Sequence, residues 1–237
     1  MARVDRSKKD YLEGLWAYWA FEDPTTDTIY DQSGNERDGI GYNLEKIKGI
    51  LGDAYWFNGT NSYVAIPSDV ATLPEDAITV SLWYYTPEQP TQNRILISKH
   101  YTYTITSPFR SFKATTYSMG IYLTSDLIRF AVSRAQGDVN TISADIIWGR
   151  WVHVAGTWDG EIQRLYVDGE LKAEVEYSGS LYQALNPIYI GRFHTDHYFY
   201  GKIDEVMIFE KALTETEVRK LYEIYKRERQ KVKVRVV

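Results

Sequence analysis

The sequence contains no cysteine, which excludes a disulfide framework, a thiol nucleophile and a cysteine-ligated metal. It has no run of about 18 apolar residues, so no membrane-spanning helix is predicted. Its first ten residues lack the apolar core of a signal peptide. Acidic residues outnumber basic ones by 32 to 27, and the basic residues are scattered until the C-terminal end. We therefore expect neither membrane insertion nor a nucleic-acid partner.

Aromatic residues, in contrast, are abundant: 20 Tyr, 7 Trp and 8 Phe make up 15% of the chain. Aromatic side chains favour β-strands, and exposed rings also form flat surfaces in binding sites. A β-sheet core accounts for some of these rings, but not easily for 20 tyrosines. The composition therefore favours an all-β fold with rings left over for binding.

From residue 15 onward, short apolar runs alternate with turn signals, a pattern that is typical of a β-sandwich. Residues 78–85 form a long apolar run that predicts a buried strand. Asn58-Gly59 predicts a hairpin over residues 54–66. Asp168-Gly169 predicts a second hairpin over residues 164–173, with a type I′ turn because both central residues accept positive φ.

One helix is expected after the last strand. Thr214 and Glu217 form a capping box at its start. Val218, Leu221 and Tyr225 then recur on one helical face, as in an amphipathic helix. We expect this apolar face to pack on the sandwich.

No internal repeat and no Pro/Gly/Ser-rich linker divides the chain, so a single folded domain is expected. We expect this domain to span residues 14–225, with its helix over residues 214–230. Residues 1–13 form a polar N-terminal extension in this interpretation. Residues 226–237 form a basic tail, or a linker to another part of a larger multidomain protein.

A series of short motifs follows in a fixed order from Leu15 to Tyr222, at residues 18–22, 31–35, 38–39, 52–59, 63–64, 79–83, 149–155, 165–169, 190–191, 201–206 and 212–217. In this order the motifs resemble a laminin-G-like domain of the concanavalin A-like lectin/glucanase superfamily. The resemblance implies a two-sheet antiparallel jelly-roll β-sandwich with one C-terminal amphipathic helix. Such domains mostly serve as binding or adhesion modules, often for carbohydrate, in cell-surface, secreted or viral proteins. We therefore expect an extracellular, cell-surface or virion location.

The resemblance also implies a structural calcium ion, whose side-chain ligands here would be Glu22, Asp31, Asn35 and Asp204. Ca²⁺ prefers carboxylate, amide and carbonyl oxygens, which the loop at residues 31–35 offers. Asp204 lies in an apolar run, where a buried carboxylate needs a partner or a metal. In the alternative interpretation, Asp204 caps a loop through backbone N–H groups and Asp31 makes an Asx turn.

Residues 99–117 are a first candidate for the ligand site, because domains similar to this one usually have a short turn there. Tyr101 and Tyr103 share one face of any extended strand, and exposed rings of this kind stack on sugar faces. Alternatively, the rings pack under their own segment. The rings are Tyr101, Tyr103, Phe109, Phe112 and Tyr117.

The loop between the last two strands is the second candidate, with Arg192, Asp196 and Tyr198 as a polar binding rim. His194 and His197 allow another interpretation, a transition-metal site with imidazole ligands. The sequence offers no third clear ligand for such a metal, so the binding rim is the preferred interpretation.

No catalytic motif is recognised, although the superfamily includes β-glucanases. Glycoside hydrolysis needs two carboxyl groups at a fixed separation, and the sequence has no Glu-x-Asp-x-x-Glu run along a strand. Asp204 and Glu205 are adjacent, so we expect them to point to opposite faces. There is also no Gly-x-Ser-x-Gly motif.

The sequence therefore predicts a non-catalytic binding or adhesion module that binds carbohydrate and contains a structural calcium ion. The alternative is a structural or adhesive domain that binds a protein partner at a cell or virion surface. A glycoside hydrolase is the third interpretation, and it would need a catalytic pair drawn from separate strands.

Overall fold

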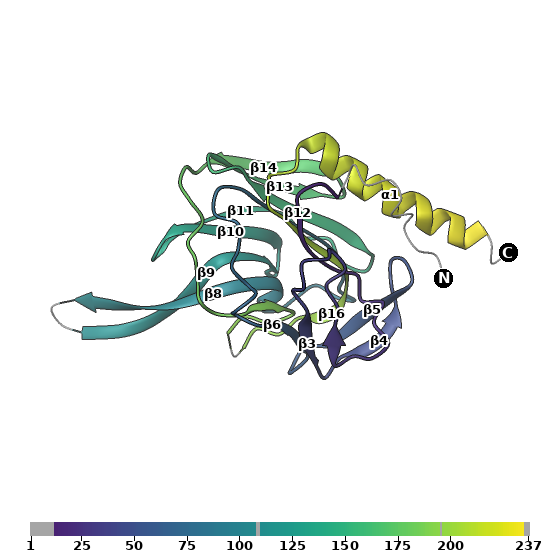
Figure 1. The fold of residues 1–237 in the computed structure, drawn as a ribbon, viewed down its shortest axis with the longest axis horizontal. Coiled ribbons are helices and arrows are strands. Elements are labelled where there is room, and N and C mark those ends of the chain that lie inside the picture. The colour runs from purple at the N-terminus through teal and green to yellow at the C-terminus, as the bar shows by residue number, and fades with distance from the viewer. Residues whose placement is uncertain (1–11, 108–109, 195, 235–237) are drawn as a thin grey trace.

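The computed structural model describes residues 12–107, 110–194 and 196–234. Two eight-stranded antiparallel sheets form a sandwich, as the sequence predicts (Figure 1). The first sheet contains β14 (Glu170–Glu176), β13 (Ile162–Val167), β12 (Val152–Trp158), β7 (Ile78–Tyr85), β16 (Tyr200–Phe209), β5 (Asp53–Asn58) and β4 (Glu45–Lys48), with β1 (Leu15–Trp19) paired to β16. The second sheet contains, in order, β11 (Asp138–Asp145), β10 (Leu127–Ala135), β9 (Arg110–Leu123), β8 (Arg94–Ser107), β15 (Ile188–Ile190), β6 (Tyr63–Ile66), β3 (Gly39–Tyr42) and β2 (Thr28–Ile29).

The core between the sheets follows from the alternation of side chains along each strand. In β15, Ile188 and Ile190 are fully buried in this core, whereas Tyr189 between them is half-buried. In β6, Val64 and Ile66 are likewise in the core and Tyr63 is half-buried. Because neighbouring residues of a strand point to opposite faces, Tyr63 and Tyr189 lie on the outer face of the second sheet.

Helix α1 (Glu215–Val234) covers the outer face of the first sheet. The predicted capping box is present, because the Glu217 amide donates to Thr214 Oγ1 and the Thr214 amide donates to Glu217 Oε2. Val218, Leu221 and Tyr225 are buried in an apolar cluster with side chains of the sheet. The helix also continues through most of the basic segment that we expected to be a tail. No helix among the described residues is long and apolar enough to cross a membrane.

The two predicted hairpins have different outcomes. Asp168-Gly169 joins β13 to β14 as predicted, with φ values of 51° and 78°. Asn58-Gly59 instead leads from β5 in the first sheet to β6 in the second, so the hairpin predicted over residues 54–66 is wrong. The Asn58 side-chain oxygen accepts the backbone N–H groups of residues 60–62, which shapes this crossover. Turn chemistry is local, whereas the choice of strand partner depends on packing between distant segments.

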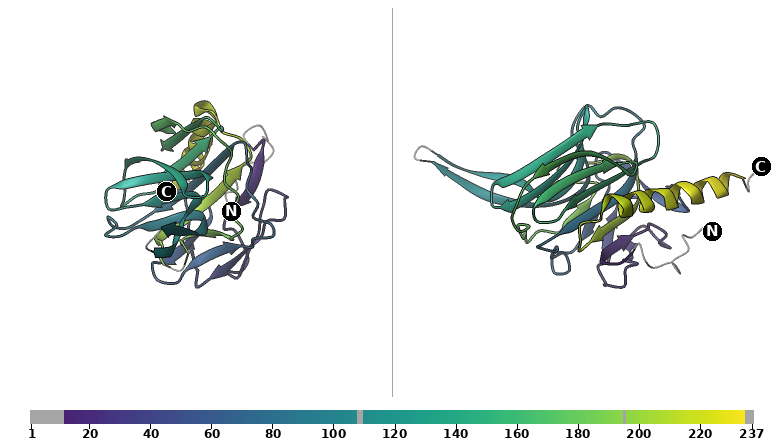
Figure 2. Two further views of the ribbon diagram at one scale, coloured as in Figure 1. Left: turned by 90° about the vertical axis from the view of Figure 1, so that its left-hand side faces the viewer. Right: turned by 90° about the horizontal axis from the view of Figure 1, so that it is seen from above.

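The segment at residues 99–117 is part of two long strands rather than a compact loop. β8 and β9 pair as far as Ser107 and Arg110. They extend beyond the body of the sandwich as a two-stranded arm, on the side opposite the C-terminal end of helix α1 (Figures 1 and 2).

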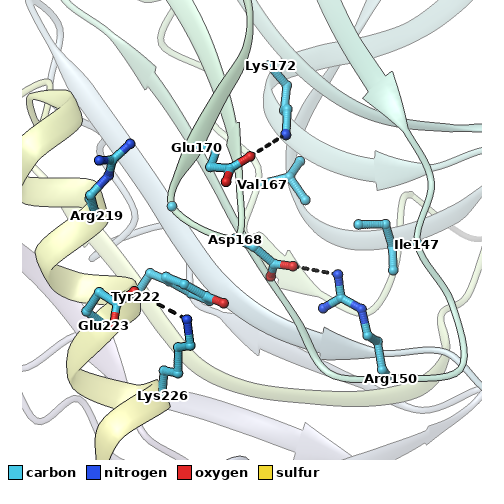
Figure 3. Close-up of a pocket in the computed structure, with 11 residues that line it drawn as sticks. Ile147, Arg150, Val167, Asp168, Glu170, Lys172, Arg219, Tyr222, Glu223 and Lys226 are labelled. Carbon is cyan, nitrogen blue, oxygen red and sulfur yellow. Dashed lines mark hydrogen bonds and ion pairs between the residues drawn. The ribbon is translucent and has the colours of Figure 1, made fainter.

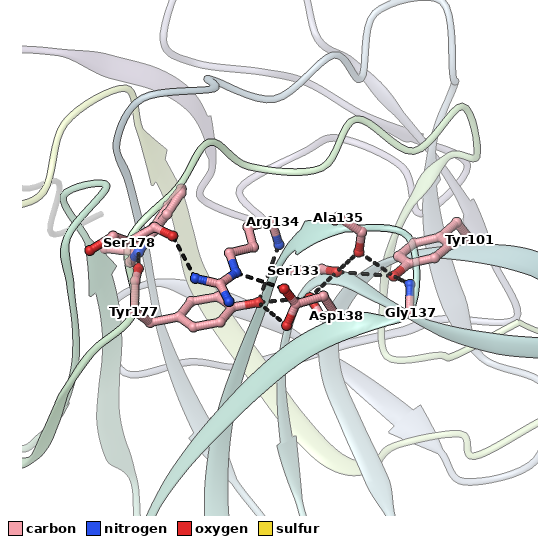
Figure 4. Close-up of polar contacts among 9 residues, drawn as sticks. Tyr101, Ser133, Arg134, Ala135, Gly137, Asp138, Tyr177 and Ser178 are labelled. Atoms are coloured by element: carbon pink, nitrogen blue, oxygen red, sulfur yellow. Dashed lines mark hydrogen bonds and ion pairs between the residues drawn. The ribbon is translucent and has the colours of Figure 1, made fainter.

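The base of this arm is fixed to the turn between β10 and β11 (Figure 4). The Tyr101 hydroxyl lies 2.9 Å from Ser133 Oγ and accepts the Gly137 N–H over 2.8 Å. In the same turn, Arg134 and Asp138 form a 2.6 Å ion pair. These contacts set the position at which the arm leaves the domain.

Candidate ligand-binding site and metal site

The two segments that the sequence singles out meet at one pocket beside the outer face of the second sheet. The pocket has a volume of about 470 Å³. β8, the segment that precedes β15, β15 itself and the loop that follows it all contribute to the lining. Its polar lining residues include His100, Gln183, Asn186, Tyr189, Arg192 and His194.

Arg192 packs against two nearly perpendicular aromatic rings at this pocket. Its guanidinium carbon is 3.9 Å from the centroid of the Tyr63 ring and 4.2 Å from that of Tyr189. Tyr42 stacks on Tyr63, with 4.4 Å between the two ring centroids. The three tyrosines come from β3, β6 and β15, so a continuous aromatic row crosses three strands. Arginine stacked on ring faces keeps the N–H groups of its plane available for hydrogen bonds.

His100 is buried beside this row and takes part in a cluster of rings. Its ring stacks on Tyr189 with a centroid distance of 5.6 Å, and it lies 5.3 Å from both Phe193 and His194. Burial, together with the smaller effects of nearby His194, Arg192 and Lys99, lowers the pKa of His100 to about 4. The imidazole is therefore neutral at pH 7.

Three polar atoms that belong to lining residues of this pocket are buried and have no hydrogen-bond partner within the described part of the chain. They are His100 Nδ1, Gln183 Oε1 and Arg192 Nε. Buried polar atoms in proteins are usually hydrogen-bonded, because an unmade hydrogen bond costs about 1–3 kcal/mol. An arrangement of this kind is suited to a polar ligand that supplies the missing partners.

The five predicted ligand residues are not all in the pocket. Tyr101 and Arg192 line it. The Tyr101 ring, however, is buried and its hydroxyl is hydrogen-bonded at the base of the arm, as in the alternative interpretation. Tyr103 is half-buried beside Tyr101, with 5.8 Å between ring centroids.

Asp196 and Tyr198 lie in the loop that follows β15. Asp196 is exposed in a tight turn with Phe193, and its carboxylate is 3.8 Å from His197 Nε2. Tyr198 is half-buried, with its ring 6.3 Å from that of Tyr63. Tyr198 and Arg192 thus both lie next to Tyr63, whereas Asp196 does not line the pocket.

Three aromatic rings of residues 99–117 remain, and only the Tyr117 ring is among the described side chains. Phe109 lies outside the described residues, and so does the side chain of Phe112. Tyr117 stacks on Tyr122 at 5.0 Å, in a small apolar cluster with Phe193. This ring packs against its own surroundings, as the alternative interpretation of the segment expects.

Sequence reasoning missed Tyr42, Tyr63, Tyr189 and a role for His100. The signal for Tyr63 and Tyr189 was nevertheless present, because each alternates with aliphatic residues that face the core. An aromatic residue at the outward position of a strand contributes little to the core, so its ring is available for other contacts. The role of His100 had no such signal, since it depends on residues distant in sequence.

A second hollow of about 510 Å³ lies between helix α1 and the β13–β14 turn (Figure 3). Tyr222 of the helix forms part of its wall. Three of its basic side chains have acidic partners, in the pairs Arg150–Asp168 at 2.6 Å, Lys172–Glu170 at 2.7 Å and Lys226–Glu223 at 3.5 Å. The charges of this hollow are thus largely compensated from within.

Of the predicted calcium ligands, Glu22 and Asp204 are brought together. Asp204 Oδ2 accepts the Ile50 N–H over 2.8 Å, and Glu22 Oε1 accepts the Asp53 N–H over 3.0 Å. The turn between β4 and β5 therefore contacts both carboxylates. It needs glycine to do so, since a Cβ at Gly52 would lie 1.8 Å from Glu22 Oε1.

Asp204 fits a cation in two further respects. The residue is fully buried, and Asp204 Oδ1 has no hydrogen-bond partner among the described residues. Burial raises the pKa of Asp204 well above its usual value, and the charges of Glu205 and Glu22 add to the rise. A divalent cation would offset this repulsion and supply the missing partner.

Asp31 and Asn35 are engaged elsewhere. Asp31 Oδ1 accepts the N–H groups of Tyr18 and Ser33, each over 2.9 Å, which is the Asx turn of the alternative interpretation. Asn35 donates to the carbonyls of residues 15 and 16. Within the described residues, no three His, Cys, Asp or Glu side chains form a group that could hold a metal ion. Calcium stays a prediction, and Glu22 with Asp204 is the part of the ligand set that fits it.

The expectation that Asp204 and Glu205 point to opposite faces is wrong. The register between β16 and β7 shifts after Asp204, and Glu205 adopts a positive φ of 54°. This bulge turns both carboxylates to the helix-covered side. Glu205 Oε2 accepts hydrogen bonds from the hydroxyls of Tyr18 and Tyr225, and both carboxylates are buried. The pair is therefore closed to a substrate.

The fold defines a class of protein, the two-sheet concanavalin A-like β-sandwiches. A model of the concanavalin A-like lectin/glucanases superfamily, Laminin_G_3, matches residues 58–219. This match covers more than half of the chain, so the protein belongs to that family. The sequence is 26% identical over 180 residues to pappalysin-1 of Mus musculus and 24% identical to that of Homo sapiens. Each match covers 70% of this chain but only 11% of the relative, so this domain corresponds to a small part of a much longer protein.

Solved structures with a similar fold include toxin binding domains. The binding domain of botulinum neurotoxin serotype G superposes with a TM-score of 0.69 at 16% identity, over 89% of this chain and 51% of the toxin chain. Domain 4 of AbnA, a GH43 extracellular arabinanase from Geobacillus stearothermophilus, was solved with arabinotriose. It superposes with a TM-score of 0.64 at 20% identity, over 88% of this chain and 98% of that one. At these identities the likeness concerns the fold alone.

Proposed function

We propose that this protein is a non-catalytic carbohydrate-binding module whose ligand occupies the pocket beside Tyr189 and Arg192. The observation that carries the proposal is the set of three unpartnered polar atoms, His100 Nδ1, Gln183 Oε1 and Arg192 Nε, beside an aromatic row. Sugars present both kinds of surface that such a site needs. Their C–H faces pack on rings, and their hydroxyls donate and accept hydrogen bonds.

The comparisons support a binding role without identifying the ligand. The similar solved structures include toxin binding domains, and another of them, from the arabinanase, was solved with arabinotriose. The correspondence to one part of the long pappalysin-1 chain supports a module within a larger protein. A module that binds glycans outside the cell is consistent with both.

A glycan array followed by calorimetry tests the proposal. We expect saturable binding of at least one glycan class, and a loss of about tenfold when Tyr189→Ala removes a ring, since an aromatic contact is worth about 0.5–1.5 kcal/mol beyond the area it buries. Tyr30→Ala is the matched control, because Tyr30 is 48% exposed and does not line the pocket. No binding across the array, or equal losses in both variants, would overturn the proposal.

We further propose that calcium binds at Glu22 and Asp204 and serves a structural role. When bound, the ion would neutralise the acidic cluster there, while Glu22 and Asp204 hold the β4–β5 turn through the Asp53 and Ile50 amides. Elemental analysis after dialysis against calcium measures the metal directly. One equivalent per chain is expected, and its complete absence would contradict the proposal.

A second candidate function, recognition of a protein partner, is favoured by the β8–β9 arm. Beyond Lys99 and Met119, the described strands of the arm pair only with each other, so both outer edges lack a neighbouring strand. Open strand edges are templates for an added strand from another chain. Shortening the arm would abolish binding to such a partner but leave glycan binding intact.

A further inference from the structure

The pocket of the proposed function is surrounded by basic groups. His100, Arg192 and His194 line it, and Lys99 precedes His100 on β8. Of the described residues that line the pocket, none is Asp or Glu. This is unexpected in a chain with a net charge of −5, in which acidic residues outnumber basic ones.

Two cations near His100, Arg192 in the lining and Lys99 next to it in sequence, have no acidic partner among the described residues. The Lys99 ammonium is buried and donates to the backbone carbonyl of Asn186 over 2.6 Å. Burial lowers the pKa of Lys99 to about 8, so it is still mostly charged at pH 7. Across the described part of the chain, neither Lys99 nor Arg192 forms an ion pair. Among the described residues of the adjoining turn, Asp196 has the only carboxylate, and it lies 3.8 Å from His197 Nε2.

The hollow beside helix α1 is an internal comparison. It too contains basic side chains, but three of them pair with carboxylates of the same hollow. Around His100 no carboxylate of the described residues plays this part, and Arg192 and Lys99 both disfavour the protonated form of His100. A set of like charges in a partly buried site is costly unless an opposite charge joins it.

From this arrangement we infer that the ligand is an acidic glycan, whose carboxylate or sulfate group binds Arg192 and His100 while its sugar ring packs on Tyr189. The inference rests on the proposed function and specifies its ligand class. Arg192 is suited to this role because its guanidinium packs in the corner between the Tyr63 and Tyr189 rings and its planar N–H groups match an oxyanion. His100 Nδ1 and Arg192 Nε are then the buried atoms that the anion satisfies.

A panel of matched oligosaccharides tests this inference. Each backbone is offered in three forms, neutral, as a uronate and as a sulfate ester, to the full chain at constant ionic strength. We expect the uronate or the sulfate ester to bind at least about tenfold more tightly than the neutral form, as hydrogen bonds to charged groups are the stronger ones. The uronate and sulfate arms distinguish the two sources of negative charge.

Arg192→Gln should abolish the preference for acidic forms, and Arg219→Gln on helix α1 is its matched control. Arg219 is exposed and lines the other hollow, so its loss should change no affinity by more than about twofold. Neutral forms that bind as tightly as acidic ones would overturn the inference and leave the proposed function intact. Failure of every form to bind would overturn both.

The His100 ring offers a readout that does not depend on affinity. An NMR titration of the imidazole should show its pKa rising from about 4 when a saturating uronate or sulfated ligand is present. A bound acidic ligand that leaves this pKa unchanged would place the anion elsewhere and contradict the inference. Unfolding temperatures of all variants show whether a lost affinity reflects a lost fold.

Discussion

The two outer faces of this sandwich are both rich in aromatic side chains, but they differ in cover and in charge. On the first sheet, helix α1 covers Trp83, Tyr166 and Met207, and the buried charges beneath it are the carboxylates Asp204 and Glu205. On the second sheet, a pocket leaves the outer face accessible beside Tyr189, and the charged side chain of Arg192 in its lining is basic.

From this difference we expect the covered face to contribute stability and the open face to bind the ligand. The covered face uses its rings in packing, and the acidic cluster next to it is suited to a cation. Both faces have unpartnered polar atoms, but those of the open face belong to residues that line a pocket with Arg192, which suits an anionic ligand. Changes on the covered face should therefore alter unfolding, whereas changes on the open face should alter binding.

The largest effect is expected for Asp204→Asn. Calcium in large excess over its Kd should stabilise the wild-type domain by about 4 kcal/mol, or roughly 10 °C, and the variant should lose this gain. Without metal, the variant should be at least as stable as the wild type, because a buried charge with a raised pKa is removed.

Thermal unfolding with calcium and with a chelator measures both quantities for Asp204→Asn. Asp31→Asn is the control, since it weakens the hydrogen bonds of the Asx turn under both conditions and should leave the calcium shift in place. If calcium raises the unfolding temperature of Asp204→Asn as much as that of the wild type, calcium does not bind at this face.

Leu221→Ala is the next largest change and should act on stability alone. Leu221 is buried between helix α1 and the first sheet, and such truncations cost about 2–5 kcal/mol. Denaturant unfolding should report this loss, while glycan affinity at a temperature where the variant is folded should stay within about twofold. A large loss of affinity in the folded variant would show that the two faces are coupled. Leu171→Ala, on the exposed edge strand β14, should cost far less.

Acid should destabilise both faces through their buried histidines, but ligand should protect only one. Burial lowers the pKa of His153 under helix α1 to about 3, and that of His100 is lowered to about 4. Both are neutral when folded and take up protons when unfolded, so stability is lost as the pH falls from about 6.5 towards these values.

Urea unfolding between pH 7 and pH 4.5, in the Asp204→Asn background, measures this loss without the opposing effect of the raised Asp204 pKa. His100→Gln and His153→Gln should each flatten the dependence. Adding the acidic glycan should reduce only the part of the pH dependence of stability that arises from His100. Stability that rises steadily towards pH 4.5 in this background would contradict the assignment.

Tyr101→Phe should have the smallest effect. It removes the hydroxyl that joins Ser133 and the Gly137 amide at the base of the arm, at a cost of about 1 kcal/mol. Amide exchange at Gly137 should accelerate. Tyr103→Phe is the matched control, and equal exchange in the two variants would show that Tyr101 does not hold the arm.

Much of the fold was predictable because its signals are local. The capping box at Thr214 and the type I′ turn at Asp168-Gly169 are set by neighbouring residues, and the structure confirms both. The crossover at Asn58-Gly59 and the bulge at Glu205 were not predictable. Each depends on which strands pair, and the bulge also requires a positive φ that glutamate rarely adopts.

The site was predictable only in part, for a related reason. Arg192 and the segment containing Tyr101 were found from composition, and both line the pocket. The ring cluster of His100, Tyr189 and Phe193 joins residues nearly a hundred positions apart, and nothing local marks it. Among the predicted calcium ligands, the positions of Glu22 and Asp204 depend on the bulge and on the distant β4–β5 turn. The position of Asp31 depends on its local Asx turn.

Chemical-shift mapping with an acidic oligosaccharide tests the division between the two faces most directly. The account predicts saturable shifts at the amides of His100, Tyr189 and Arg192, and none along the buried face of helix α1. Saturable shifts centred on helix α1, with the amides around Tyr189 unmoved, would contradict it.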